Sequence, residues 1–154
     1  MAEKERMLII CVDRDNDLYE KVKTRGPVIG REANLNAAMR LALHDPQDPD
    51  ANTIFAALKK FDELEKEYTT QVVTFTGDAK LGMKADKEIS NQLDRVLQEF
   101  PADGCVYISD GASDDEILPV ITSRIKVISA QIVFMKQAKE LEKTYFIILE
   151  KLKD

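Results

Sequence analysis

The chain has 154 residues, a formal net charge of −6 and 44% hydrophobic residues. This length fits one domain, residues 1–154, and the negative charge argues against nucleic-acid binding, which relies on clustered lysines and arginines. No secretory signal is visible, and no apolar run approaches the roughly 20 residues of a membrane span. We therefore expect a soluble, cytoplasmic domain that does not insert into a membrane.

The first structured segment is an unbroken apolar run, Met7 to Val12, which ends in a series of carboxylates. Such a run without alternation is typical of a central strand that helices cover on both faces. Three further segments, 70–76, 105–108 and 126–134, have the composition of strands. Cys11 and Cys105 lie inside two of these runs, and we expect buried thiols there, not a disulfide or a metal pair.

Apolar residues at helical spacing separate these strands. They predict helices over 31–43, 51–67, 83–100 and 137–152, and a short helix capped by Ser113. Either Asp48 or Asp50 is expected to cap the second helix, and the last helix is expected to bury Leu141, Tyr145, Ile148 and Leu152. Segment 13–30 has neither helical nor strand periodicity. We interpret it as a charged loop, which is either a flap over a ligand or a solvated loop.

The order of these elements predicts an α/β fold with right-handed crossovers between parallel strands. We expect a small doubly wound domain, Rossmann-like or flavodoxin-like. It would be a three-layer sandwich with a mainly parallel four-stranded sheet. In such a sheet the carboxyl ends of all parallel strands share one edge, which is where ligands bind.

Acidic residues follow three of the four predicted strands. Asp13 and Asp15 come after the first, Asp78 after the second and Asp110 after the third. Because these positions share one edge, we expect the four carboxylates to converge on a divalent cation. Oxygen ligands favour Mg²⁺ or Mn²⁺. The alternative is that these aspartates only cap turns and helices, a common use of this residue type.

A phosphate site is expected beside the cation. Two predicted helices follow Gly30 and the loop 109–113, and free N–H groups at helix N-termini bind anions. The expected ligand-binding residues are Arg25, Gly30, Arg31, Ser109, Gly111 and Ser113. The alternative for Arg31 is a structural ion pair with a nearby acid.

One motif points to catalysis. The residues V-D-R-D-N-D-L from Val12 are similar to the first motif of haloacid-dehalogenase-like phosphatases. This resemblance implies that Asp13 is a nucleophile and Asp15 a general acid and base. Asp17 stands where that family usually has Thr or Val, and the acid that the family carries after Gly77-Asp78 is absent at its spacing.

A second resemblance covers nearly the whole chain. It rests on D-R-D-N-D, G-P-V-I-G-R-E-A-N-L-N-A-A, L-H-D-P-Q-D-P-D-A-N, T-G-D, S-D-G-A-S-D-D, L-P-V-I-T-S-R and K-T-Y-F-I-I-L. With these stretches the chain resembles an archaeal family without assigned function, domain of unknown function family three-seven-three, often labelled predicted membrane proteins. The resemblance implies that the chain corresponds to the soluble part of longer members, which carry a transmembrane portion after it. It implies no reaction or ligand.

Three interpretations of function stay open. The first, which we favour, is a module that binds a small anionic or phosphorylated ligand with a divalent cation, in a sensory or regulatory role. The second is a metal-dependent phosphoesterase or related hydrolase. The third is a structural domain that forms a homo-oligomer, for example through the apolar run 145–149.

Overall fold

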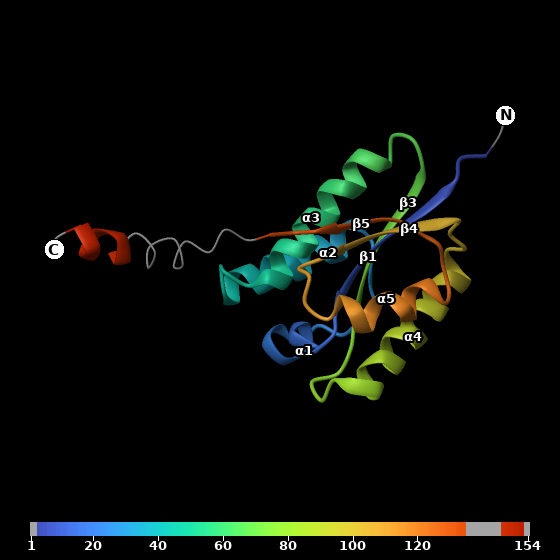
Figure 1. Ribbon diagram of the computed structural model, residues 1–154. Helices are drawn as coiled ribbons and strands as arrows, with labels where there is room; N and C mark the ends of the chain where they lie inside the picture. The colour runs from blue at the N-terminus through green and yellow to red at the C-terminus, as the bar shows by residue number, and fades with distance from the viewer. Residues whose placement is uncertain (1–2, 135–145, 153–154) are drawn as a thin grey trace.

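The central sheet has five strands in the order β2-β3-β1-β4-β5. Figure 1 shows the strands of this sheet and the helices beside them. This computed structural model describes residues 3–134 and 146–152. The strands are β1 (Arg6–Asp13), β2 (Val28–Ile29), β3 (Thr69–Thr76), β4 (Gly104–Ser109) and β5 (Val127–Ile132). The helices are α1 (Asp17–Val22), α2 (Arg31–His44), α3 (Pro49–Leu64), α4 (Gly82–Glu99) and α5 (Asp114–Thr122).

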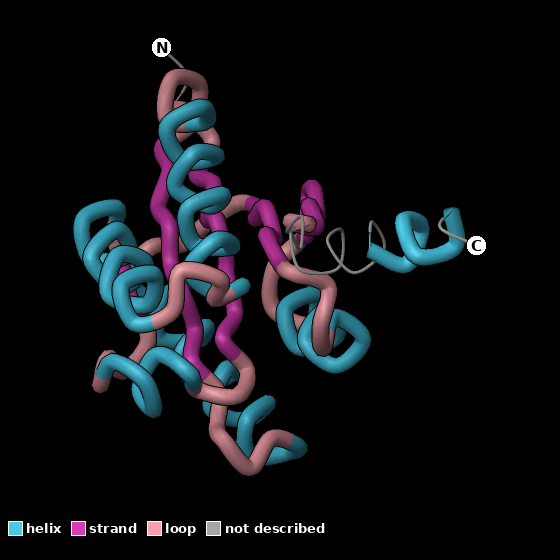
Figure 2. Tube along the Cα trace, turned by 90° about the vertical axis from the view of Figure 1, so that its left-hand side faces the viewer, coloured by secondary structure: helices cyan, strands magenta, loops and turns pink. Residues whose placement is uncertain are grey.

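β1 alternates between the two faces of the sheet although all of its central residues are apolar. Met7, Ile9 and Cys11 pack in a core with α2 and α3. Leu8 and Ile10 pack in a second core with α4 and α5. Helices therefore cover both faces of the sheet, as the trace in Figure 2 also shows, and the predicted three-layer α/β sandwich is confirmed.

The two cysteines are free, and each is buried in one of these cores. Burial raises the pKa of the Cys105 thiol to about 12, and it raises that of Cys11 as well. Neither thiol is therefore ionised at neutral pH, which agrees with the expectation of inert buried side chains.

β1 is the middle strand and pairs in parallel with β3 on one side and β4 on the other. After β1 the chain forms β2 and β3 on one side of it. The chain then crosses to the other side of β1, where it forms β4 and finally β5. The connections that leave β1 and β4 therefore lead in opposite directions. A crevice between the carboxyl ends of two such strands is the usual ligand site of open α/β sheets.

The sheet has one strand more than the four that the sequence predicts. β2 pairs antiparallel with the outer side of β3, with Val28 opposite Thr74. The buried side chain of Asn34, on α2, donates to Val28 O (2.9 Å) and accepts from Thr74 Oγ1 (2.6 Å). The Asn34 side chain thus links α2 to both β2 and β3 through hydrogen bonds. Two residues are too few to show a strand periodicity, which explains why the pattern does not predict β2.

Segment 13–30 is also more ordered than the predicted loop, because it contains α1 as well as β2. Leu18 on α1 is fully buried and packs in the core beneath α2 and α3. The six residues of α1 form fewer than two turns, and this length is too short to show a helical period. The interpretation of the whole segment as a loop is therefore wrong.

Two predicted helix caps have different outcomes. Asp48 caps α3, since its Oδ1 accepts a hydrogen bond from Asp50 N at 2.8 Å. Ser113 directly precedes α5 as predicted, but its φ is 68° and its side chain makes no capping bond. The left-handed backbone of Ser113 differs from the extended conformation in which a serine hydroxyl normally caps a helix.

The last predicted helix, 137–152, lies partly outside the described residues, which include neither Leu141 nor Tyr145. Residues 146–152 are helical. Ile148 and Leu152 are 52% and 76% exposed, so the expectation that they are buried is wrong. Both cores are formed without them. Across 3–134 and 146–152, no helix has the length and apolar character needed to cross a membrane.

Candidate functional site

Asp13, the last residue of β1, organises the connection that follows this strand. Its carboxylate is buried, and its two oxygens accept hydrogen bonds from Asp17 N (3.0 Å) and Leu18 N (2.8 Å) at the start of α1. Its backbone oxygen accepts from Gly77 N (2.8 Å), which follows β3. Asp13 therefore ties the end of β1 to both α1 and the loop after β3.

Four carboxylates meet at this end of the sheet. Asp13, Asp15, Asp17 and Asp50 each offer one oxygen, and these four oxygens all lie within 4.8 Å of one another. We call these residues the acidic cluster. Asp13 ends β1, Asp15 lies in the turn that follows, and Asp17 begins α1, whereas Asp50 comes from the first turn of α3. Oxygens that share one cation at about 2.0–2.6 Å lie at most about 4–5 Å apart, so this spacing suits a common ion.

The acidic cluster is electrostatically crowded. Burial raises the pKa of Asp13 to about 8, and a hydrogen bond with the Asp15 carboxylate raises it further. Burial, followed by the charges of Asp13 and Asp48, raises the pKa of Asp50 to about 9. The pKa of Asp17 is raised too, first by burial and then by Asp15. Without a cation, Asp13 and Asp50 therefore retain their protons at neutral pH.

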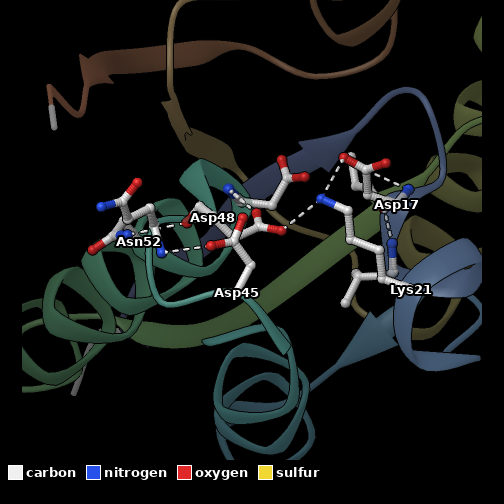
Figure 3. Close-up of polar contacts among 9 residues, drawn as sticks. Asp17, Lys21, Asp45, Asp48 and Asn52 are labelled. Atoms are coloured by element: carbon white, nitrogen blue, oxygen red, sulfur yellow. Dashed lines mark hydrogen bonds and ion pairs between the residues drawn. The ribbon is translucent and has the colours of Figure 1, made fainter. Parts of the chain in front are cut away.

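A lysine lies beside the acidic cluster but is bound to another acid. Lys21 Nζ on α1 lies 2.9 Å from Asp48 Oδ2 and 3.7 Å from Asp17 Oδ2 (Figure 3). Asp48 is fully buried, and its hydrogen bond with Lys21 raises the pKa of the lysine. Lys21 therefore compensates Asp48 first and Asp17 second, and neither ion pair includes Asp13, Asp15 or Asp50.

A cavity of about 130 Å³ adjoins the acidic cluster between the ends of β1 and β4. Its lining residues are Val12, Arg14, Asp15, Asp50, Leu81, Asp110, Ala112, Ser113 and Ile117. Asp15 and Asp50 thus belong both to the acidic cluster and to the cavity wall. Arg14 Nε is bound to Asp86 Oδ1 at 3.1 Å. The cavity lies at the point of the sheet where the connections of β1 and β4 diverge.

The loop after β4 forms the opposite wall of this cavity. Asp110 accepts a hydrogen bond from Ala112 N (3.0 Å), and its carboxylate is not one of the four clustered groups. Ser109 donates to Asp114 Oδ2 (2.9 Å) and accepts from Gly111 N (3.1 Å). The Ser109 hydroxyl and the Gly111 amide thus bond to the protein itself, while Ser113 lines the cavity at the start of α5.

The other expected site residues lie elsewhere. Asp78 is outside the acidic cluster; it accepts from Lys80 N (2.9 Å), and this bond lowers its pKa. Arg25 places its guanidinium 4.0 Å from the centre of the Tyr19 ring. The structure therefore does not bring these two residues to the four clustered carboxylates.

Gly30 and Arg31 lie away from the carboxyl edge of the sheet. Gly30 N donates to Val72 O (2.8 Å), halfway along β3. Arg31 forms two hydrogen bonds with Asp62, of 2.8 and 3.0 Å. At 1.5 Å per residue, Asp62 lies about 18 Å along α3 from Asp50. Arg31 therefore makes the structural ion pair that was its alternative interpretation.

Sequence reasoning did not select Asp17 and Asp50 as ligands. A signal for Asp50 was present in the order of elements. The helix before β3 has to start at the carboxyl edge of the sheet, because β3 starts at the opposite edge. This order of elements places the acids of D-P-D at 48–50 at the same edge as Asp13, although the sequence pattern alone predicts them only as helix caps.

The chain is similar to proteins whose roles are not known. It is 39% identical over 150 residues to an uncharacterised protein of Archaeoglobus fulgidus, which covers 97% of the chain. It is 34% identical over 148 residues to an uncharacterised protein of Methanocaldococcus jannaschii, which covers 95% of it. The matched regions make up 44% and 40% of those proteins, so the chain spans less than half of their length. No solved structure matches it.

The sequence profile described as "Domain of unknown function (DUF373)" matches residues 6–154. This range includes every strand and helix described above and all members of the acidic cluster. The resemblance found in the sequence motifs is thus confirmed, and the chain belongs to the DUF373 family.

Proposed function

We propose that this domain binds a divalent cation, Mg²⁺ or Mn²⁺, at the acidic cluster, and that the cation holds an anionic group of a small ligand in the adjoining cavity. The observation that carries the proposal is the convergence of four carboxylate oxygens within 4.8 Å of one another. Two of these carboxylates, Asp15 and Asp50, also line the cavity between the ends of β1 and β4. All four donors are oxygens, which Mg²⁺ and Mn²⁺ prefer.

Electrostatics supports a cation at this position. Like charges at short distance destabilise one another, and Asp13 and Asp50 have raised pKa values for this reason as well as through burial. Either protons or a cation can relieve this repulsion. Lys21 is engaged by Asp48 and is not positioned to neutralise all four carboxylates.

The cavity indicates what kind of ligand group the cation would hold. A volume of about 130 Å³ admits a phosphate or a carboxylate, but not a whole nucleotide. Arg14, the basic side chain on its wall, is paired with Asp86. Cation and anion together would restore charge balance beside Asp15 and Asp50. The longer relatives contain this domain as less than half of their length, and we propose that its ligand binding has a sensory or regulatory role.

A metal-dependent phosphoesterase is the second candidate. The observation in its favour is Asp15, an exposed carboxylate on both the acidic cluster and the cavity wall, where it can orient a metal-bound water. The version in which Asp13 is the nucleophile is less favourable. Both Asp13 oxygens accept backbone N–H groups, and its raised pKa keeps it protonated in the absence of a cation.

Thermal unfolding of the 154-residue chain with Mg²⁺ or Mn²⁺ tests the proposal. A cation at 100 times its Kd adds about 2.7 kcal/mol to the free energy of unfolding, a shift of several degrees in Tm. We expect Asp15→Asn and Asp50→Asn to abolish this shift. Asp78→Asn is the matched control, because Asp78 is an acid near the same edge but outside the acidic cluster.

Absence of a shift with either cation, or an equal loss in Asp78→Asn, would contradict the cation site. The ligand is tested separately with inorganic phosphate, which should add a further shift only when the cation is present. Cation-dependent release of phosphate from a generic ester, such as p-nitrophenyl phosphate, would show that the domain is a phosphoesterase and does more than bind its ligand.

A further inference from the structure

β5 forms an exposed edge of the sheet. Every residue of this strand except Val127 is exposed, and no strand lies beyond it in the part of the chain that the structure describes. The stretch from Val127 to Phe134 contains neither a charged residue nor a proline. Its register with β4 shifts once, at a bulge that includes Ile128, and is regular from Ser129 to Ile132. Monomeric proteins usually protect such edges with charges, prolines, bulges or very short strands, because an open edge pairs with other strands.

The opposite edge of the sheet has this protection. β2 consists of two residues and follows Pro27, which has no N–H group to donate. Val28 is buried, and Asn34 covers the backbone oxygen of Val28 with a hydrogen bond. The molecule thus protects one edge of its sheet, whereas the other edge is regular and open from Ser129 to Ile132.

The hydrogen bonds of β5 show which of its backbone groups face outward. Val133 N donates to Ser109 O at 2.7 Å, so Val133 points its backbone groups toward β4. Because the direction alternates along a strand, Ser129 and Gln131 point toward β4 as well. Ala130 and Ile132 therefore direct their N–H and C=O groups away from the sheet, and these are the groups available to a partner strand.

We propose that this edge pairs with β5 of a second copy of the chain, antiparallel and centred near Ala130, so that the two sheets become one. A strand that pairs antiparallel with its own copy is self-complementary and closes a two-fold dimer. Each chain has a net charge of −6, and an uncharged edge is the part of its surface where two copies meet without like-charge repulsion.

The side chains of β5 fit this register. Centring on Ala130 brings a small residue to the axis and Ile128 of each copy, which lies at the bulge of β5, beside Ile132 of the other. These two isoleucines are 51% and 47% exposed, so pairing would cover apolar surface that water contacts in a single chain. The two acidic clusters then lie at opposite ends of the combined sheet and do not repel each other.

The mass of the 154-residue chain in solution, measured by light scattering after gel filtration, tests this proposal. We expect twice 17.4 kDa for the wild type and 17.4 kDa for Ala130→Pro. The proline removes an outward N–H group and leaves the bonds between β4 and β5 intact. Ala130→Ser keeps that N–H group and is the matched control, which should remain a dimer.

Amide hydrogen exchange gives a second readout that does not depend on any variant. The amides of Ala130 and Ile132 should exchange more slowly as the concentration of wild-type chain rises, while those of β2 should not change. A monomeric wild type, or an Ala130→Pro chain that keeps its circular dichroism and remains a dimer, would overturn the proposal. If the wild type is a monomer, the partner of this edge is not a second copy of the chain.

Discussion

Asp48 uses one carboxylate oxygen to accept from Asp50 N at 2.8 Å and the other to accept from Lys21 Nζ at 2.9 Å. A single buried carboxylate thus caps α3 and links it to α1, the two helices that carry members of the acidic cluster (Figure 3). Asp48 is not itself one of the four clustered groups, yet it fixes the position of two of them, Asp17 and Asp50.

Lys21→Met should destabilise the fold by about 2 kcal/mol, because it leaves a buried carboxylate without its charged partner. Arg31→Met is the matched control. It removes one partner of an exposed pair with Asp62 and should change the stability little. Urea denaturation of both variants measures the difference. An equal effect of the two changes would show that Asp48 does not depend on Lys21.

Without a divalent cation, the free energy of unfolding should fall as the pH rises from about 5 to 9. The folded pKa values of Asp13 and Asp50, about 8 and about 9, lie above the unfolded value of 3.8. The folded state therefore binds more protons than the unfolded state in this range, and the stability due to these protons is complete only below about pH 4. Denaturation in EDTA across this pH range measures the fall.

Asp50→Asn should flatten this pH dependence, because an amide in place of the carboxyl group has no proton to lose. Asp62→Asn is the control. The pKa of Asp62 is lowered by Arg31, so Asp62 titrates at acid pH and should not affect the range above pH 5. A stability that rises between pH 5 and 9 in EDTA would contradict the raised pKa values.

Binding of Mg²⁺ at pH 7 should release protons. Asp13 and Asp50 hold protons in the cation-free protein and have to lose them to become ligands. Calorimetry in two buffers of different ionisation enthalpy measures this release, since the apparent heat of binding then depends on the buffer. The apparent affinity should also rise with pH. A heat that is independent of the buffer would mean that the cation binds groups that are already ionised.

Leu18→Ala should both destabilise the fold and weaken cation binding. Leu18 is fully buried beneath α1, and its truncation should cost about 2–5 kcal/mol while loosening the helix that begins at Asp17. Ile89→Ala on α4 is the matched control on the other face of the sheet. It should cost a comparable amount of stability and leave the affinity for Mn²⁺ unchanged. An equal loss of affinity in both variants would attribute the effect to global destabilisation.

The larger elements of this fold can be predicted from the sequence, because long apolar periods and an unbroken central run are local signals. α1 and β2 cannot, since they depend on distant partners. Asp13 has to reach the amides that start α1, and Asn34 has to contact both Val28 and Thr74, which lies 40 residues after Asn34 in the sequence. Neither contact produces a periodic pattern of apolar residues in the sequence, so neither can be predicted from such a pattern.

The candidate site is predictable to a similar extent. The rule that ligands lie at the carboxyl ends of parallel strands selects Asp13 and Asp15, whose carboxylates the structure brings together. It does not place Arg31, because β2 carries the chain back along β3 before α2 begins. It also overlooks Asp50, whose position depends on how α2 and α3 return the chain to that edge.

The dual origin of the acidic cluster has a kinetic consequence. Three of its carboxylates are close in sequence, whereas Asp50 reaches them only once α2 and α3 have docked on β1. We expect a cation that needs all four ligands to bind late, after the barrier to folding has been crossed. It should slow the rate of unfolding and leave the rate of folding nearly unchanged. Binding of the cation should therefore mainly lengthen the lifetime of the native state.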